Sequence, residues 1–294
     1  MTAPLPPGAR PPERAVWING RICRGLDAML SIADRGARDG QGLFETLRVY
    51  GGHPFRWQPH LERMVLSAAE LGFPVPPSPA TLREALGELL EVEGLSEAVV
   101  RLTITRGVAG GRPTRAGAWL EVEPLGGRLW SGPRAGRASA IFSKMAFHPG
   151  PLGRHKTTSR LAYHLAHEEA RAEHADEALL VDPSGVVLEG ATSNVFAIAD
   201  RVLLTPPLAA GILPGVTRAV VLRLAQEIGL PAREQSLTPA DLARATEVFV
   251  TNSVQEVVPL SLLGGRQVRE QSIGRRLHDH YADTVARETA SVRT

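Results

Sequence analysis

The apolar residues in the first half of the chain follow helical and strand-like patterns. Two stretches place apolar residues at spacings of three and four, which gathers them on one side of a helix. These residues are Leu61, Met64, Val65, Ala68 and Leu71 after Pro59, and then Leu82, Ala85, Leu86, Leu89 and Leu90. Alternating or apolar runs predict strands at 17–18, 44–50, 99–105 and 118–122. Together these elements predict a small α+β domain over residues 15–124.

Glycine marks the turns of this domain and of its boundary. Asn19-Gly20 and Gly51-Gly52 are typical of tight hairpin turns. The loop at 107–111 is also rich in glycine, but it lacks the strand-to-helix setting of a dinucleotide-binding loop. Residues 125–136, rich in Gly, Pro, Arg and Ser, are predicted to link this domain to a larger one over 137–294.

The second half of the chain has a different order of predicted helices and strands from the first half. A helix is expected after Lys156 with Leu161, Leu165 and Ala166 facing inward. Two hairpins are predicted, followed by helices and two strands, without a sustained repeat or a nucleotide-binding βαβ alternation. The hairpins pair 178–182 with 186–189 and 194–198 with 202–205. One helix is expected to begin at Thr217 and to end at Gly229, and another to begin at Thr238-Pro239. The two strands are 247–251 and 254–260. The basic stretch 275–293 is predicted to be an exposed helix.

Composition narrows the functional class. The chain has 294 residues, 43% hydrophobic residues and a formal net charge of +2 that is spread along the sequence, so a nucleic-acid partner is not expected. The proline-rich residues 1–14 are predicted to be disordered. A single cysteine, Cys23, cannot form an internal disulfide. Neither a signal peptide nor a membrane-spanning run is recognisable, so a cytoplasmic location is expected.

Lysine is scarce: of 33 basic residues only Lys144 and Lys156 are lysines. Lysine is the side chain that condenses with an aldehyde, and a buried carboxylate such as Glu189 can keep a pyridine ring protonated. This pair suggests pyridoxal phosphate chemistry at Lys156. Scarcity alone would equally follow from an arginine-rich composition, and Lys144 has no such neighbours and is interpreted as a surface residue.

Two places could hold the phosphate of that cofactor. Gly215-Val216-Thr217 opens a predicted helix, whose first amides and the Thr217 hydroxyl favour an anion, although an ordinary N-cap fits the same residues. Arg63, off the apolar stripe of its helix, offers a bidentate guanidinium, although taken alone it is better explained as a solvated surface residue. A metal pair at His164 and His167 is disfavoured, because no third ligand is conventionally spaced.

These segments, taken together from about Trp17 to Val268, resemble the fold-type IV pyridoxal-phosphate enzymes. That family includes branched-chain and D-amino-acid aminotransferases and 4-amino-4-deoxychorismate lyase. The resemblance implies an α/β (α+β) fold with two domains, the larger having a β-barrel-like core. It rests on several motifs in order: Asp34-Arg35-Gly36, Gly42-Leu43-Phe44-Glu45, His60 to Arg63, Lys156, Glu189 to Asn194, Gly215 to Arg218, and Thr251-Asn252-Ser253.

The resemblance also implies a role for each motif. Lys156 would be the Schiff-base lysine that then removes the α-proton, and Glu189 would face the pyridine nitrogen. The remaining cofactor-binding residues would be Arg63, Ser193, Asn194, Val216, Thr217 and Ser253. A homodimer and a small-molecule amine substrate are expected on the same basis.

The reaction depends on fewer residues. Thr46 after Phe44-Glu45, and Asn252, resemble the lyase pattern, so the sequence predicts conversion of 4-amino-4-deoxychorismate to 4-aminobenzoate and pyruvate in folate biosynthesis, with Thr46 relaying a proton. Phe44, Arg106 and Asn252 would contact the substrate, and Arg112 belongs to the same loop as Arg106. A β-branched strand residue explains Thr46 equally well.

Two alternatives to the lyase stay open. The first is a class IV aminotransferase acting on D-amino or branched-chain amino acids with a 2-oxo acid acceptor. Leu161 stands where branched-chain enzymes have tyrosine five residues after the lysine, which argues against a typical branched-chain site. The second is a binding protein on an inactive scaffold, against which Lys156 and Glu189 argue.

Overall fold

The computed structural model describes residues 14–108 and 117–290. The predicted disordered tail therefore lies outside the described residues except for Arg14, and so do Arg112 and most of the predicted glycine-rich loop. The chain divides into two compact units. Of the described residues, unit 1 contains 14–108, 117–125, 155–159 and 289–290, and unit 2 is Gly126–Arg154 with Arg160–Glu288. The short segment 155–159, which contains Lys156, thus belongs to unit 1.

Unit 1 is built on an antiparallel sheet with strand order β2-β1-β6-β5-β3-β4. The predicted Asn19-Gly20 turn is confirmed, since both residues have positive φ angles of 50° and 100°. Each predicted strand is present. The strands are β1 (Val16–Ile18), β2 (Arg21–Cys23), β3 (Gly42–Tyr50), β4 (His53–Pro54), β5 (Ala98–Thr105) and β6 (Gly117–Pro124).

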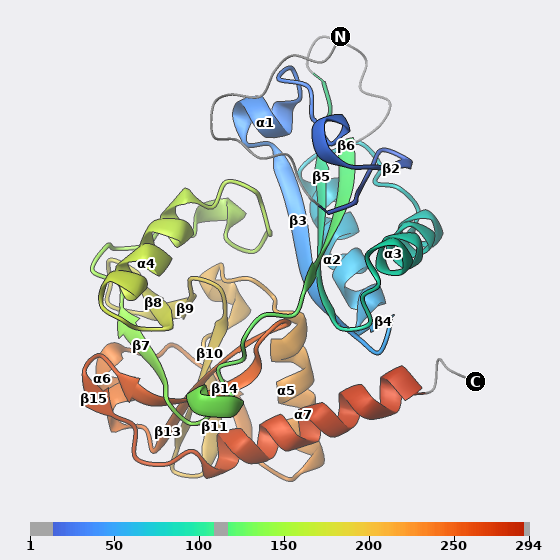
Figure 1. Cartoon of the computed structure of the whole chain (residues 1–294). Helices are drawn as coiled ribbons and strands as arrows, with labels where there is room; N and C mark the ends of the chain where they lie inside the picture. The colour runs from blue at the N-terminus through green and yellow to red at the C-terminus, as the bar shows by residue number, and fades with distance from the viewer. Residues whose placement is uncertain (1–13, 109–116, 291–294) are drawn as a thin grey trace. The chain divides into compact units, whose positions relative to one another are not determined.

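Two amphipathic helices, α2 (Trp57–Glu70) and α3 (Pro79–Glu93), cover one side of this sheet (Figure 1). All five apolar residues predicted for α3 are buried. In α2 the prediction fails at Val65, which is 47% exposed, because the buried face also includes His60 and Ser67. The helix α1 (Arg35–Asp39) and the 3-10 turn η1 (Gly25–Asp27) complete the unit.

Unit 2 contains a second, larger sheet of order β12-β11-β10-β13-β14-β7-β8-β9, with β15 paired to β14. Its two predicted hairpins, β8–β9 and β10–β11, are present. The sequence pattern missed β7, which pairs in parallel with β8 and β14. The strands are β7 (Ala138–Phe142), β8 (Glu177–Val181), β9 (Val187–Gly190), β10 (Asn194–Ala199), β11 (Val202–Thr205), β12 (Ala232–Glu234), β13 (Glu247–Asn252), β14 (Glu256–Leu263) and β15 (Arg266–Gln267).

The helices of unit 2 correct two expectations. In α4 (Leu161–Ala172), Ala166 and Ala170 face the core, whereas Leu161 and Leu165 are 70% and 50% exposed. The predicted inward leucines are therefore wrong, because the helix packs through small alanines on another face. Helix α7 (Ser272–Ala290) is not simply exposed, since it buries one face. The remaining elements are α5 (Val216–Glu227), α6 (Pro239–Arg244), η2 (Gly132–Arg134), η3 (Gly150–Leu152) and η4 (Leu208–Ala210).

Because β7 and β8 are parallel and α4 lies between them in sequence, they form one βαβ connection, which was not predicted. Phe196 and Phe249 stack within unit 2 with ring centroids 5.0 Å apart, on the neighbouring strands β10 and β13. Of the helices that the structure describes, none combines the length and the apolar composition needed to cross a bilayer.

Candidate functional site

Lys156 is held on the edge of the unit 1 sheet. The Phe44 amide donates to the Lys156 carbonyl at 2.9 Å, and the Thr158 amide donates to the Gly42 carbonyl at 2.9 Å. The segment 156–158 therefore pairs with the start of β3, as a short strand would. The Lys156 Nζ lies 4.6 Å from the centre of the Phe44 ring. Of the residues predicted near the substrate, Phe44 is thus beside the predicted catalytic lysine.

The second predicted group in unit 1, Arg63, is bound by a buried carboxylate. Its Nε and one terminal nitrogen donate to the two oxygens of Glu45, at 2.8 and 2.6 Å. The His60 Nδ1 lies 2.7 Å from Glu45 Oε2. Strand β3 presents Glu45 and helix α2 presents both partners, so the cluster also fastens the helix to the sheet. The sequence analysis singled out Arg63 but not its partner.

The charges in this cluster follow from its burial. Burial raises the pKa of the Glu45 carboxyl, but the positive charge of Arg63 and the hydrogen bond from His60 lower it more, leaving that pKa at about 2. Burial lowers the pKa of His60 despite its bond to Glu45, and the charges of Arg63 and Lys156 lower it further. Glu45 is therefore ionised at neutral pH and His60 is neutral, so the Nδ1–H of His60 donates to Glu45.

In unit 2, Glu189 is a buried carboxylate with several donors. Its Oε2 accepts from the Leu213 amide at 3.1 Å and from Asn194 Nδ2 at 3.5 Å, and its Oε1 accepts from the Tyr163 hydroxyl at 3.5 Å. The guanidinium carbon of Arg160 lies 3.6 Å from the centre of the Tyr163 ring. Donors to both oxygens fix the orientation of this carboxylate and favour its charged form.

Tyr163 and Arg160 were missed by sequence reasoning. Burial and the negative charge of Glu189 raise the pKa of Tyr163 to about 12, so its hydroxyl stays protonated and can donate. Both residues lie at the start of α4, within seven positions of Lys156. A search for a tyrosine only at position 161 overlooked the one at 163.

The predicted anion site at the start of α5 is assembled within unit 2. Gly215 is the N-cap without a side-chain cap, and Thr217 is buried. The Thr217 and Ser253 hydroxyl oxygens lie 3.4 Å apart. A β-carbon at Gly215 would lie 2.0 Å from Asn194 Oδ1, so only glycine fits. Helix amides and two hydroxyls thus gather where an anion would be stabilised.

Other predicted residues have local structural partners. Ser193 Oγ donates to Glu177 Oε2 at 2.7 Å. Arg106 donates from one nitrogen to the carbonyls of Leu71, at 2.6 Å, and Gly72, at 3.1 Å. Their predicted contacts with cofactor and substrate remain predictions.

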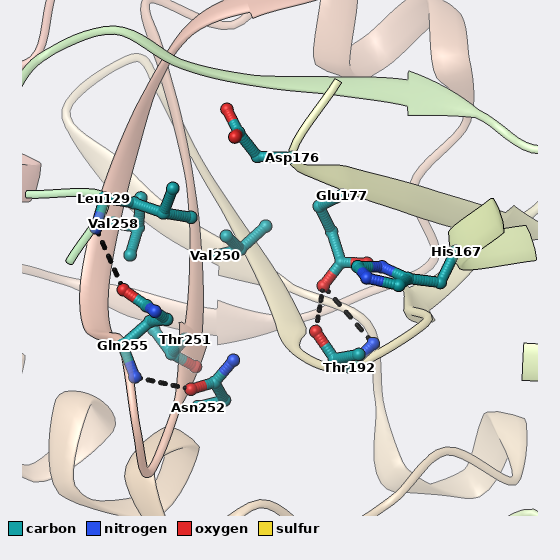
Figure 2. Close-up of a pocket in the computed structure, with 10 residues that line it drawn as sticks. All are labelled: Leu129, His167, Asp176, Glu177, Thr192, Val250, Thr251, Asn252, Gln255 and Val258. Carbon is teal, nitrogen blue, oxygen red and sulfur yellow. Dashed lines mark hydrogen bonds between the residues drawn. The ribbon is translucent and has the colours of Figure 1, made fainter. Parts of the chain in front are cut away.

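A cavity of about 250 Å³ opens elsewhere in unit 2 (Figure 2). Among the described residues that line this cavity, Asn252 is the one that was predicted to belong to the functional site. The lining residues are Leu129, His167, Asp176, Glu177, Thr192, Val250, Thr251, Asn252, Gln255 and Val258. His167, weighed as a metal ligand, lines this cavity, but no cluster of three or more potential metal ligands occurs among the residues described.

Comparison with known proteins gives a consistent family. Residues 42–263 match the family model "Amino-transferase class IV". The branched-chain-amino-acid aminotransferase of Escherichia coli K12 is 32% identical over 88% of both chains, and the D-alanine aminotransferase of Bacillus licheniformis is 31% identical over 86% of this chain and 89% of its own.

A solved structure agrees with this family. The T.th. branched-chain amino acid aminotransferase with pyridoxamine 5'-phosphate has a TM-score of 0.84 and 29% identity, and the match covers 93% of this chain and 94% of that one. The predicted mixed α/β fold of type IV is thereby confirmed.

These relatives show that the predicted lyase activity is wrong, since they are aminotransferases of branched-chain and D-amino acids. The two residues behind that prediction have structural duties. Thr46 is a strand residue of β3 paired with Arg101. The Asn252 Oδ1 accepts from the amides of Val254, at 3.0 Å, and Gln255, at 2.7 Å, which shapes the turn after β13. Neither residue type therefore required a lyase.

Proposed function

The chain belongs to the class IV aminotransferase family, and we propose that it transfers the amino group of an amino acid to a 2-oxo acid. Similarity to aminotransferases over some nine-tenths of the chain carries this proposal; the match to the Escherichia coli enzyme covers 88% of it. The cofactor is pyridoxal phosphate, as the sequence predicted, in keeping with the family and with the pyridoxamine 5'-phosphate in the T.th. relative.

The residues present fit this cofactor chemically. The start of α5 offers uncapped amides and the buried Thr217 hydroxyl beside Ser253, which suits a phosphate. Glu189 is a buried carboxylate, and the hydrogen bonds donated to it favour its charged form, which suits a protonated ring nitrogen. In unit 1, Lys156 supplies an amine and Arg63 a guanidinium that Glu45 orients. We propose that these residues bind one cofactor molecule.

Bound pyridoxal phosphate supplies an aldehyde and an electron-accepting ring. The Lys156 Nζ would bind the aldehyde covalently and, once displaced by the substrate amine, move the proton at the substrate α-carbon. Glu189 would hold the proton on the ring nitrogen, while the Leu213 amide and Asn194 keep its carboxylate in place. Thr217, Ser253 and Arg63 would hold the phosphate. Ser193, Val216, Phe44 and Arg106 keep their predicted cofactor and substrate roles as part of this proposal.

Branched-chain L-amino acids are the first candidate donors, since the Escherichia coli and T.th. relatives carry that name. D-amino acids are the second. One relative is a D-alanine aminotransferase, and Leu161 stands where the branched-chain pattern has tyrosine. The family resemblance leaves both donors open, because both relatives are aminotransferases whose names differ in the amino acid that donates.

Amino-donor screening of the purified, cofactor-loaded protein tests the proposal. L-leucine, L-valine, L-isoleucine, D-alanine and D-glutamate are each added without acceptor, and absorbance follows conversion of the cofactor to its pyridoxamine form. Conversion by at least one donor, reversed by 2-oxoglutarate, is expected. Lys156→Ala should abolish it, while Lys144→Ala, the only other lysine variant possible in this chain, should leave it unchanged. No conversion by any donor would reject the amino acid aminotransferase.

We also propose that the protein is a homodimer. Unit 2 exposes large apolar side chains on α4 and the preceding segment, Leu161 and Leu165 with Met145 and Leu152 at 40% and 45% exposure. Such side chains are more usual at an interface than in solvent. Light scattering during size exclusion should give twice the 31.5 kDa of one chain. Leu165→Glu should give the single-chain mass, whereas Val92→Glu, an exposed position of α3, should not.

A further inference from the structure

Helix α2 carries a polar stripe beside its apolar one. His60, Arg63, Ser67 and Glu70 follow one another at spacings of three and four, which places them along one face. The first two contact Glu45, as described above. The last two contact a residue distant in sequence, His155. Every contact of the stripe named here lies within unit 1.

His155 is a buried histidine, 6% exposed, immediately before Lys156. Its Nδ1 lies 3.0 Å from Ser67 Oγ, and its Nε2 lies 3.5 Å from Glu70 Oε2. A histidine side chain with a polar partner at each ring nitrogen is fixed in position and in rotation. The ring therefore ties the backbone just before Lys156 to helix α2.

The other side of the same segment is tied to strand β3. The Lys156 carbonyl accepts from the Phe44 amide, and the side chains of Thr158 and Ser159 both donate to the Gly40 carbonyl at 3.0 Å. Strand β3 and the Gly40 carbonyl just before it thus hold Lys156 and the residues after it. The His155 side chain holds the backbone on the other side of Lys156. Without the His155 side chain, the segment would keep its pairing with β3 and lose the two contacts with Ser67 and Glu70 of α2.

We propose that His155 is a positioning residue that, through Ser67 and Glu70, sets the place of the Lys156 amine relative to Arg63 on the same helix. This inference rests on the proposed function, which makes Lys156 the reacting amine. Lysine has a flexible four-carbon stem, so the position of its amine depends on how firmly its backbone is held. A displacement of about 1 Å at a reacting group can lower a rate by about 10²-fold.

The central variant is His155→Phe, which keeps a ring of similar bulk and removes both polar contacts. Its kcat for the preferred donor should fall by about 10- to 100-fold, while KM changes by less than about threefold, because the substrate-binding groups are untouched. Peptides covering 42–46 and 155–159 should exchange amide hydrogen faster in the full-length protein, because the segment is less firmly held. His155→Asn, whose amide can occupy the place of Nδ1, should recover part of the loss in kcat.

Milder variants address the partners of His155. Ser67→Ala and Glu70→Gln should each lower kcat, and Ser67→Ala should add little to His155→Phe, because His155→Phe already removes the contact with Ser67. Glu62→Gln is the matched control for Glu70→Gln, since it makes the same change on an exposed position of α2 outside the stripe. It should change neither kcat nor hydrogen exchange.

These experiments distinguish a failure of the positioning role of His155 from a failure of the proposed function. A folded His155→Phe protein with parental kcat and parental exchange at 155–159 would overturn the positioning role, as would equal effects of Glu62→Gln and Glu70→Gln. If His155→Phe does not fold, the Ser67 and Glu70 variants decide on the same two measurements. If the parent transfers no amino group, the proposed function fails, whereas hydrogen exchange still decides whether His155 holds the segment.

Discussion

Replacing Glu45 by glutamine is expected to destabilise unit 1 by about 3 kcal/mol at neutral pH. Folding lowers the pKa of this carboxyl from 4.5 to about 2, and a tenfold change in proton affinity corresponds to about 1.4 kcal/mol. The side chain is only 1% exposed, so solvent screens the interaction little. Glutamine would leave the Arg63 charge without its carboxylate, a change of similar size in other buried pairs.

The same reasoning fixes the pH dependence. Because the folded-state pKa is lowered, the stabilisation is complete above pH 4.5 and is lost as the pH falls through the folded-state pKa of about 2. The difference between the parent and Glu45→Gln should therefore shrink below pH 4.5 by about 1.4 kcal/mol for each pH unit. Urea unfolding at pH 7, 4 and 3 measures this difference.

Tryptophan fluorescence is a suitable signal for that titration, because Trp17, Trp57 and Trp119 lie in unit 1 and only Trp130 lies in unit 2. Glu62→Gln, on the exposed side of α2, serves as the control and should change stability by less than about 0.5 kcal/mol. A Glu45→Gln protein within about 1 kcal/mol of the parent at pH 7, or a difference that stays constant down to pH 3, would refute the ionised, arginine-paired carboxylate.

Two glycines and one tyrosine allow further tests. Gly215→Ala would place a methyl group 2.0 Å from Asn194 Oδ1, so affinity for added pyridoxal phosphate, measured by fluorescence titration, should fall at least tenfold. Gly87→Ala, within α3 and with open space around the new carbon, should raise the free energy of unfolding by about 0.5–1 kcal/mol in urea titrations. With a pKa of about 12, Tyr163 should contribute almost no phenolate absorbance below about pH 10, so spectrophotometric titrations of the parent and Tyr163→Phe should coincide up to that pH.

The elements of unit 1 are largely readable from the sequence, because most of them carry a clear helical or strand-like pattern of apolar residues. The buried residues of α3 follow strict helical spacing, and Ser78 caps the helix by accepting from the Thr81 amide at 3.1 Å. Helix α4 shows the limit of this method. Its alanines at 166 and 170 face the core and its leucines do not, and apolar spacing alone does not say which of two apolar faces a helix buries within its own chain.

Strand β7 was missed for a different reason. Its five residues, Ala138–Phe142, are short and include a serine, and both of its partners are parallel strands. Parallel pairing brings together segments distant in sequence and leaves no turn signal between them. No element was therefore predicted from the sequence at Ala138–Phe142, where the fold places the first strand of a βαβ connection.

In the candidate site, too, some residues could be selected from the sequence and others could not. Lys156 and Glu189 were selected by residue type together with the motifs around them, and their roles remain predictions. Asn194, which donates to Glu189, was among the predicted residues, but other supporting residues were not: Ser67 is 88 positions from His155, and Tyr163 is 26 positions from Glu189. The choice of reaction failed for a related reason, since Thr46 and Asn252 were interpreted by type without knowing their strand and turn partners.

The contacts of helix α2 suggest a reason for the buried ion pair between Glu45 and Arg63. Removing two charges from water costs several kcal/mol for each ion, and well-packed apolar residues often stabilise a core equally well. Stability alone is therefore a weak reason for the pair. Because two of its nitrogens donate to one carboxylate, the guanidinium of Arg63 has a fixed orientation and a fixed position relative to α2. Because His155 ties the Lys156 segment to that same helix, α2 can serve as the common reference for the two groups proposed to bind the phosphate and to react with the substrate, the Arg63 guanidinium and the Lys156 amine.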